Sequence, residues 1–187
     1  MDNKKIYLIS GKARTGKGTI SQILKEEYEK RNFKVCEIQI MRTLKAYLKD
    51  YFGWDGNDDT KPRKLLQEIG TDIIREKMNM PNFHIDHLTD DIKVLSNFFD
   101  VCIVNDIRLP QEIEILKSRF KDVVSINVTR KDYISSLNPS EQNHITELAL
   151  DNYENFDYEI VNSSLTGLTS DIIKIVDSEV NKNEIHD

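Results

Sequence analysis

"ISGKARTGKGTI" (residues 9–20) decides the fold that we expect of this chain, because three glycines, with Lys17 and Thr19 among the residues beside them, stand between an apolar run and an amphipathic one. The stretch reads Gly11-x4-Gly16-Lys17-Gly18-Thr19, which is the Walker A pattern of a phosphate-binding loop. Glycines let the backbone curl so that its N–H groups point at phosphate oxygens, and the helix that follows adds its positive dipole end. The stretch therefore predicts a P-loop between a strand and a helix.

Polar side chains within this loop suit the binding of a nucleoside triphosphate. Lys17 is placed to reach the β- and γ-phosphates, and the Thr19 hydroxyl is placed to ligate Mg²⁺. Arg14 is a second cation that could reach the transferred phosphate. We therefore expect a nucleoside triphosphate and Mg²⁺ as cofactors, and the kinase family described below implies that the triphosphate is ATP. The loop residues expected to bind them are Gly11, Ala13, Thr15, Gly16, Lys17, Gly18 and Thr19.

Apolar runs and helical patterns alternate along the chain. The apolar runs that predict strands lie at residues 4–10, 33–41, 100–106, 122–130 and 156–162. Helical spacing starts at Thr19 and recurs over 42–52, 61–78, 84–98, 109–120, 144–153 and 165–180. Strands that alternate with helices form parallel sheets covered on both faces. We therefore predict an α/β fold, a three-layer sandwich with a five-stranded parallel sheet, followed by a frayed tail at 181–187.

Composition excludes several classes of protein. Apolar residues make up 39% and charged residues 31% of the chain, as in an ordinary water-soluble domain. The net charge of −6 argues against nucleic-acid binding, and no run approaches the ~20 apolar residues of a membrane-spanning helix. The start MDNKKIYLIS lacks a signal-peptide pattern, and Cys36 and Cys102 lie in predicted strands as expected buried, reduced thiols. We expect a cytoplasmic protein with no membrane or nucleic-acid partner.

A P-loop alone does not separate kinases from other nucleotide-binding proteins. A GTPase would carry Asn-Lys-x-Asp after a strand, and the near match NKNE at 181–184 ends in the wrong residue. A motor or helicase ATPase normally needs a longer chain than these 187 residues. A small chain with a glycine after the P-loop lysine is more typical of the nucleoside monophosphate kinase group.

Six stretches along the chain resemble one kinase family. They are GKARTGKGT, LKAYLKDYFGW, RKLLQEIGTDIIRE, VNDIRLPQEIEILK, VVSINVTR and HITELALDNYENFDYEIVN. In this order, over most of residues 5–170, the chain resembles the phage-type deoxynucleoside monophosphate kinases and, more distantly, the animal-type phosphomevalonate kinases. It departs from the phage-type pattern at Gly18, where that family usually has an aspartate.

The resemblance implies a fold, an activity and a division of the chain. The fold would be a P-loop NTPase fold of the nucleoside monophosphate kinase type with a small lid, as a single domain over residues 1–187. The core would comprise residues 1–41 and 100–180, the acceptor-binding helical part 42–99, and the lid 130–147. The implied reaction is ATP-dependent phosphoryl transfer to a (deoxy)nucleoside monophosphate, which gives the diphosphate.

Polar residues four apart form a stripe on the helix predicted over 61–78. The stripe consists of Arg63, Gln67, Thr71 and Arg75, and it contains no carboxylate. By itself this pattern also fits a solvated helix face. The resemblance implies that the stripe, together with Gly70, lines the acceptor site. Arg63 and Arg75 would then hold the acceptor's phosphate, and Gln67 would read a base edge.

A carboxylate and two cations follow predicted strands. Asp106 ends the strand at 100–106, in the usual Walker B position, where it could hold Mg²⁺, orient the acceptor or cap the next helix. Arg108 is expected to clamp a phosphate, and Glu112 is expected to pair with an arginine as a structural residue. Lys45 follows the strand at 33–41, and the resemblance places it at the acceptor site, although a solvated lysine fits nearly as well.

The remaining candidates lie near the predicted lid. The resemblance implies that Arg130, at the end of a strand, neutralises charge on the transferring phosphoryl group; the alternative is an exposed arginine at a strand end. His144 and Glu147 fit a hydrogen bond that anchors the lid. Asn162 is expected beside the base of ATP, largely through its backbone. The catalytic residues that we expect are Lys17, Arg14, Asp106 and Arg130.

His84 and His87 lie three residues apart, a spacing that could suggest a metal site. Because no clear third ligand accompanies them, we interpret them as part of a polar helix face.

Three alternatives to a nucleotide kinase stay open. The acceptor could be phosphomevalonate, dephospho-coenzyme A or another small metabolite, and a hydroxyl acceptor would need Asp106 as its base. The chain could instead be a nucleotide-dependent switch or ATPase without a small-molecule acceptor. A kinase fold that binds nucleotide without turnover is the third alternative. The sequence also leaves open whether two copies form a homodimer.

Overall fold

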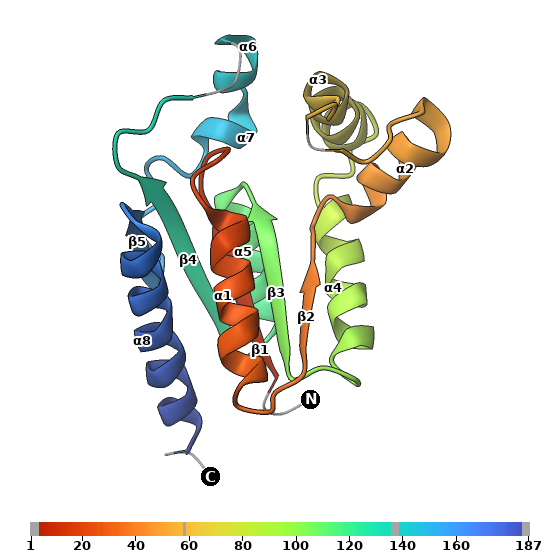
Figure 1. The fold of residues 1–187 in the computed structure, drawn as a ribbon. Helices are drawn as coiled ribbons and strands as arrows, with labels where there is room; N and C mark the ends of the chain where they lie inside the picture. The colour runs from red at the N-terminus through yellow and green to blue at the C-terminus, as the bar shows by residue number, and fades with distance from the viewer. Residues whose placement is uncertain (1–3, 58, 136–138, 185–187) are drawn as a thin grey trace.

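Five parallel strands form the central sheet of this computed structural model, which describes residues 4–57, 59–135 and 139–184 (Figure 1). The strands are β1 (Lys5–Ser10), β2 (Val35–Ile38), β3 (Val101–Ile107), β4 (Val123–Arg130) and β5 (Tyr158–Asn162). Their spatial order is β2-β3-β1-β4-β5, and every neighbouring pair runs parallel. The prediction of an α/β fold around a five-stranded parallel sheet is confirmed.

Helices cover both faces of the sheet. On one face α1 (Lys17–Glu29) and α8 (Leu165–Glu184) pack against Tyr7 and Ile9 of β1, and on the other α4 (Phe83–Leu95) and α5 (Pro110–Arg119) pack against Ile6 and Leu8. Successive side chains of a strand point to opposite faces, so both sets of β1 residues are buried. This two-sided burial explains why the strands read as continuous apolar runs.

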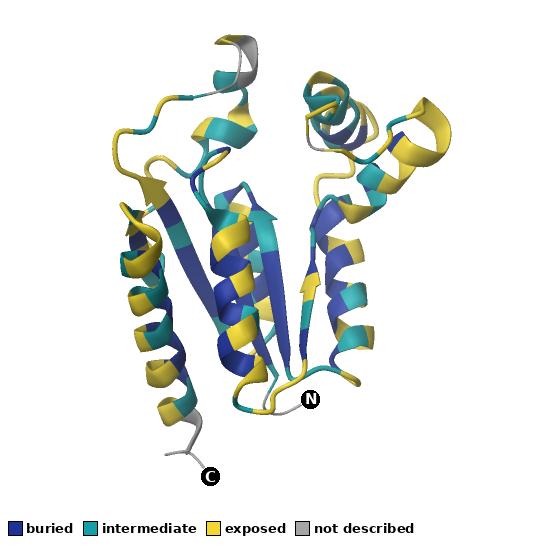
Figure 2. Ribbon diagram, viewed as in Figure 1, coloured by how far each residue is buried: buried dark blue, intermediate teal, exposed yellow. Residues whose placement is uncertain are grey.

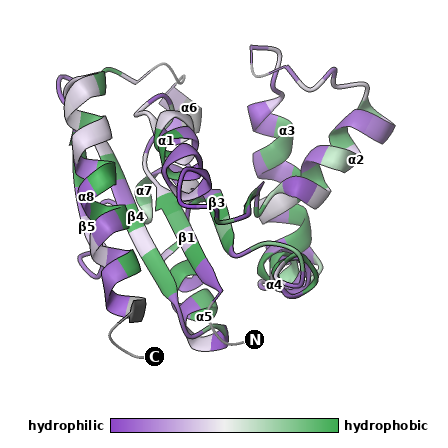
Figure 3. Cartoon of the chain, turned by 60° about the horizontal axis from the view of Figure 1, so that its bottom comes forward, coloured by the Kyte–Doolittle hydropathy of each residue, from purple (hydrophilic) through white to green (hydrophobic). Residues whose placement is uncertain are grey.

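Burial and hydropathy follow this layered arrangement. Figure 2 shows buried residues along the sheet and on the helix sides that face it, with exposed residues on the outer sides. Figure 3 shows the same division as hydrophobic and hydrophilic stretches side by side on the helices. None of the helices in the described part of the chain has both the length and the apolarity that crossing a membrane requires.

The remaining helices lie beyond the carboxyl ends of the strands. The pieces α2 (Arg42–Phe52), α3 (Arg63–Gln67) and η1 (Glu68–Lys77) stand over the β2 side, whereas α6 (Pro139–Gln142) and α7 (Ile145–Leu148) stand over the β4 side (Figure 1). In open parallel sheets, ligands bind at this carboxyl edge. The site is therefore sought between these two groups of helices.

The helix expected over 61–78 differs from the prediction in its winding. It starts as α3 and continues from Glu68 to Lys77 as a π-helix, in which the N–H of Met78 bonds to the carbonyl of Ile73, five residues back. Gly70, which has a low α-helix propensity, lies in its middle.

Smaller differences concern element ends. The tail expected to be frayed is helical as far as Glu184, and residues 185–187 lie outside the described part. Within the predicted lid (130–147), α6 covers Pro139–Gln142, and residues 136–138 are not described. The fifth strand begins at Tyr158, and the helix expected over 144–153 is confined to Ile145–Leu148. Cys36 and Cys102 are both free thiols, with Cys36 half-buried and Cys102 buried.

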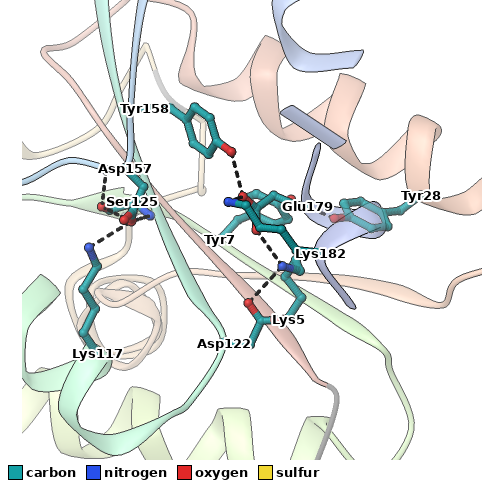
Figure 4. Close-up of polar contacts among 10 residues, drawn as sticks. All are labelled: Lys5, Tyr7, Tyr28, Lys117, Asp122, Ser125, Asp157, Tyr158, Glu179 and Lys182. Carbon is teal, nitrogen blue, oxygen red and sulfur yellow. Dashed lines mark hydrogen bonds and ion pairs between the residues drawn. The ribbon is translucent and has the colours of Figure 1, made fainter. Parts of the chain in front are cut away.

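A polar network joins the elements at the amino-terminal ends of the strands (Figure 4). The Lys5 Nζ atom donates to Asp122 Oδ1 at 2.9 Å and to Glu179 Oε2 at 2.8 Å, and Glu179 Oε1 accepts from the Tyr158 hydroxyl at 2.6 Å. Glu179 is buried, so these contacts hold α8 against β1 and β5 in a poorly solvated environment. This network supports the fold at the end of the sheet opposite the site.

Candidate active site

The P-loop requires glycine at two of its three glycine positions. Gly11 and Gly16 have φ angles of +139° and +113°, which L side chains rarely adopt. A Cβ atom would lie 2.3 Å from the Val128 carbonyl oxygen at Gly11, and 2.4 Å from Asn162 Nδ2 at Gly16. A Cβ atom at Gly18 would meet no atom within 4 Å. Glycine is therefore dictated by the backbone at the first two positions and not at the third.

Lys17 is held at the centre of the P-loop. Its Nζ atom donates to the carbonyl oxygens of Gly11 and Lys12, both at 2.7 Å. Burial, assisted by the nearby charge of Arg108, lowers the pKa of Lys17 from its usual 10.5 to about 7. Because the first turn of α1 carries no acidic residue, an anion would meet the positive helix end and this amine together.

Two hollows meet beside Lys17. We call the larger one the P-loop cleft. Its lining includes Arg14, Gly16, Lys17, Gly18 and Thr19 of the P-loop, residues of α2, and Trp54, Gly56 and Asp59. We call the second one the helical pocket; it lies between α3, η1, α7 and the end of β3. The residues shared by both hollows are Lys45, Lys61, Arg63, Asp106 and Arg108. Four of these five shared residues are cationic, so the junction suits a polyanion.

The structure brings the predicted acceptor residues together in the helical pocket. The residues that line it include Lys45, Arg63, Gln67, Gly70, Thr71, Arg75 and Arg108. The residues of the stripe still lie on one side of the helix although the winding changes to π. In an α-helix and in a π-helix alike, residues four apart lie near the same face. Gly70 is packed tightly against α2, since a Cβ atom there would lie 3.1 Å from Leu44 Cδ2.

Asp106 fastens the connection between β2 and α2. Its Oδ1 atom accepts a hydrogen bond from the N–H of Ile40 at 2.7 Å, and its Oδ2 atom accepts one from Met41 at 3.4 Å. Lys45 Nζ lies 3.6 Å from Oδ2. The alternative that Asp106 caps the next helix is wrong, because Glu112 accepts from the N–H groups at the start of α5. Asp106 nevertheless lines both hollows.

Glu112 forms the expected ion pair with an arginine. Its Oε1 atom accepts from Arg75 Nη2 at 2.7 Å, and its carboxylate is buried. Burial raises the pKa of Glu112, whereas the charge of Arg75 and two backbone N–H groups act in the opposite direction. The partner is an arginine of the stripe itself, so this pair belongs to the wall of the helical pocket.

The candidates near the predicted lid make contacts with the P-loop and with β3. Arg130 is exposed, and its Nη1 atom donates to the carbonyl of Arg14 at 3.3 Å. Glu147 pairs with Arg108 at 2.9 Å, whereas His144 accepts from the N–H of Thr146 and caps α7. His144 and Glu147 share a backbone hydrogen bond, from the N–H of Glu147 to the carbonyl of His144 at 2.9 Å, whereas the Glu147 side chain pairs with Arg108. Their role in anchoring a lid stays a prediction.

Asn162 lies under the P-loop rather than in the cleft. Its Nδ2 atom donates to the carbonyl of Thr15 at 2.9 Å. The side chain thus supports the loop backbone beside Gly16, and Asn162 is not among the residues that line the P-loop cleft.

The two histidines of α4 differ in environment. His84 is buried against Gly70 of the helical pocket, whereas His87 is exposed. Burial and the charge of Arg75 lower the pKa of His84 to about 4. The interpretation as a polar helix face is wrong for His84. Over the described ranges, no three His, Cys, Asp or Glu side chains gather as a metal site would need.

Lys61 is a site residue that the sequence reasoning missed. It lines both hollows, and its charge contributes to the lowered pKa of Lys17. The sequence feature that could have identified Lys61 is the basic run KPRK at 61–64, in which the stripe begins.

Comparisons with known proteins were consistent with this geometry. A family model described as deoxynucleotide monophosphate kinase matches residues 52–172, and no curated protein sequence matches the chain. APS kinase of Mycobacterium tuberculosis, solved with AMPPNP and APS, is 9% identical over 94% of this chain and 98% of that one, with a TM-score of 0.58. An unliganded sugar kinase from Janibacter sp. HTCC2649 is 11% identical over 95% of each chain, with a TM-score of 0.52. At these identities the structural matches show the fold alone, and that fold is shared with kinases.

Proposed function

Because the chain belongs to the deoxynucleotide monophosphate kinase family, we propose that it transfers the γ-phosphoryl group of ATP to the phosphate of a (deoxy)nucleoside monophosphate, which gives the diphosphate. The observation that carries the proposal is the cationic junction at which the P-loop cleft meets the helical pocket. One anionic ligand on each side of this junction would bring donor and acceptor phosphates face to face.

The P-loop cleft is the proposed site of ATP. The turned backbone of residues 11–19 and the start of α1 would bind the triphosphate, and Lys17 would leave its two carbonyl partners for the β- and γ-phosphates. Arg14 and Arg130 would offset charge on the transferring group. The Arg130–Arg14 contact supports this role, because it already brings the lid arginine to the P-loop.

Thr19 and Asp106 suit the Mg²⁺ that accompanies ATP. Both line the P-loop cleft, and Mg²⁺ needs few protein ligands because it keeps several waters. Thr19 would hold the ion through its hydroxyl, and Asp106 would hold it directly or through a water, because its carboxylate keeps acceptor capacity beside its two backbone hydrogen bonds. Bound there, the ion would neutralise charge on the β- and γ-phosphates.

The helical pocket is the proposed site of the acceptor. Arg63, Arg75 and Arg108 would hold its phosphate, with Lys45 and Lys61 beside them, and Gln67 would meet the base. A phosphate acceptor is already ionised at neutral pH, so the reaction needs positioning and charge stabilisation rather than a strong base. The division into a core (1–41 and 100–180), an acceptor part (42–99) and a lid (130–147) that closes to exclude water belongs to this proposal.

A coupled assay of ADP release tests the proposed function. Mg-ATP would be supplied with dGMP, dTMP, dCMP, dAMP, the ribonucleotides or phosphomevalonate in turn, with Lys17→Ala as the blank. We expect strong stimulation by one or two monophosphates, absent in the blank. Slow ADP release that no acceptor changes would refute the proposal and favour an ATPase or a switch. Stimulation by phosphomevalonate alone would instead identify a metabolite kinase.

The lowered pKa of Lys17 predicts that ATP binding depends on pH. Above a pKa of about 7 the amine loses its charge in the free protein. Because a triphosphate favours the charged amine, binding should take up a proton, and the affinity for ATP should fall by up to about tenfold per pH unit from pH 7 to 9. Calorimetry at pH 8 in two buffers of different ionisation enthalpy measures the proton uptake. An affinity that is flat over this range, or an uptake that persists in Lys17→Ala, would contradict the prediction.

A further inference from the structure

Glu112 is a buried carboxylate that holds two separate segments of the pocket wall. Its Oε1 atom accepts from Arg75 Nη2 at 2.7 Å, and its Oε2 atom accepts from the N–H groups of Arg108 at 2.9 Å and Leu109 at 3.1 Å. Glu112 is only 3% exposed. One carboxylate therefore joins η1 to the connection between β3 and α5.

The place of Glu112 in α5 gives these contacts a rigid base. Glu112 is the third residue of α5, which begins at Pro110, and it completes the helix start by binding the N–H of Leu109. Arg75, 37 residues earlier in the chain, is thereby tied to the same helix end as the backbone of Arg108. Both arginines line the helical pocket.

We propose that Glu112 is a positioning residue, which fixes Arg75 and Arg108 at the spacing that an acceptor phosphate requires. This inference rests on the proposed function. Glu112 is paired with the guanidinium of Arg75, and its charge offsets part of the repulsion among the cations of the pocket. The Nε atom of Arg75 is buried and has no hydrogen-bond partner within the described ranges, so this guanidinium keeps donor capacity for a ligand.

The alternative is that Glu112 merely stabilises the start of α5. The two roles predict different kinetics. A positioning residue that acts on ground-state and transition-state binding alike changes the KM of one substrate, whereas a stabilising residue changes the folded fraction and leaves both KM values alone.

Glu112→Gln tests the inference because it keeps the volume of the side chain and removes its charge. The amide can accept hydrogen bonds through one atom only, so either Arg75 or the helix start loses its partner. We expect the KM of the acceptor to rise at least tenfold, while the KM of ATP and kcat stay within twofold. If this variant does not fold, Glu112→Asp, which keeps the charge but is one methylene shorter, is expected to raise the acceptor KM in the same way.

Glu179→Gln is the matched control. Glu179 is equally buried, and it is ion-paired to Lys5 (Figure 4). Lys5 is the first residue of β1, so this pair lies at the end of the sheet opposite the site. This control should lower the melting temperature without changing either KM. In an Arg75→Met background, Glu112→Gln should raise the acceptor KM by a smaller factor than in the wild-type protein, because one of the two arginines that Glu112 positions is gone.

The outcomes separate this inference from the proposed function. If the wild-type protein shows no acceptor-dependent turnover, the proposed function fails and the inference fails with it. If the wild-type protein turns over and Glu112→Gln behaves like Glu179→Gln, the inference alone is overturned. It is also overturned if the KM values of ATP and acceptor rise together, or if the effect persists in full without Arg75.

Discussion

Replacing Lys17 with alanine is expected to lower acceptor-dependent turnover by at least about 100-fold, the loss typical of removing one group aimed at developing charge. The Lys17 amine lies between the carbonyls of Gly11 and Lys12, where the P-loop meets the positive end of α1. The other lysine of the loop, Lys12, is paired with Asp151 at 2.9 Å, and Arg14 is exposed, so neither replaces the amine held between these carbonyls. The measurement is ADP release at saturating acceptor.

Lys25→Ala provides the matched control for this variant. Lys25 is also on α1, is only partly buried, and lies 3.9 Å from Glu29 on the helix surface. Its loss should leave turnover within twofold and the melting temperature nearly unchanged, since exposed ion pairs contribute little. If Lys17→Ala kept more than about a tenth of the activity, the P-loop amine would not act on the transferred phosphate.

Replacing Gly16 with alanine is expected to lower the affinity for ATP by about 100-fold. At a φ of +113°, a side chain costs about 1–3 kcal/mol of backbone strain. The new Cβ atom would also lie 2.4 Å from Asn162 Nδ2, and moving this amide breaks its hydrogen bond to Thr15, worth about 1 kcal/mol. The P-loop N–H groups would then lose the orientation that binds phosphate, and calorimetric titration with Mg-ATP measures the loss.

Gly18→Ala is the control from the same loop. No atom lies within 4 Å of a Cβ at Gly18, which lies in the first turn of α1. Because alanine favours helix over glycine by up to about 1 kcal/mol, we expect wild-type affinity and an equal or higher melting temperature. Equal losses of affinity in both variants would show that any side chain in the loop blocks ATP, and would contradict the conformational argument.

The P-loop and the strands were predictable because they are local. A glycine-rich turn after an apolar run depends on residues that are neighbours in the chain, and these conformational preferences act wherever the segment lies. The same reasoning predicted the polar stripe, since the spacing of Arg63, Gln67, Thr71 and Arg75 survives in either helix type. The π-winding itself was not predictable, because residue preferences distinguish helix from strand and not one helix type from another.

The sequence by itself determined the order of the elements, the phosphate-binding loop and the family to which the chain belongs. Only the tertiary structure decided the partners of the polar groups. Asp106 binds backbone N–H groups 66 and 65 residues away, and Asn162 reaches a P-loop carbonyl 147 residues away. The burial of His84 against Gly70 also results from tertiary packing, as do the hydrogen bonds of Glu112 to Arg75 and to the N–H of Arg108. Such contacts depend on how distant elements pack, and packing leaves no pattern in the neighbouring residues from which a partner could be read.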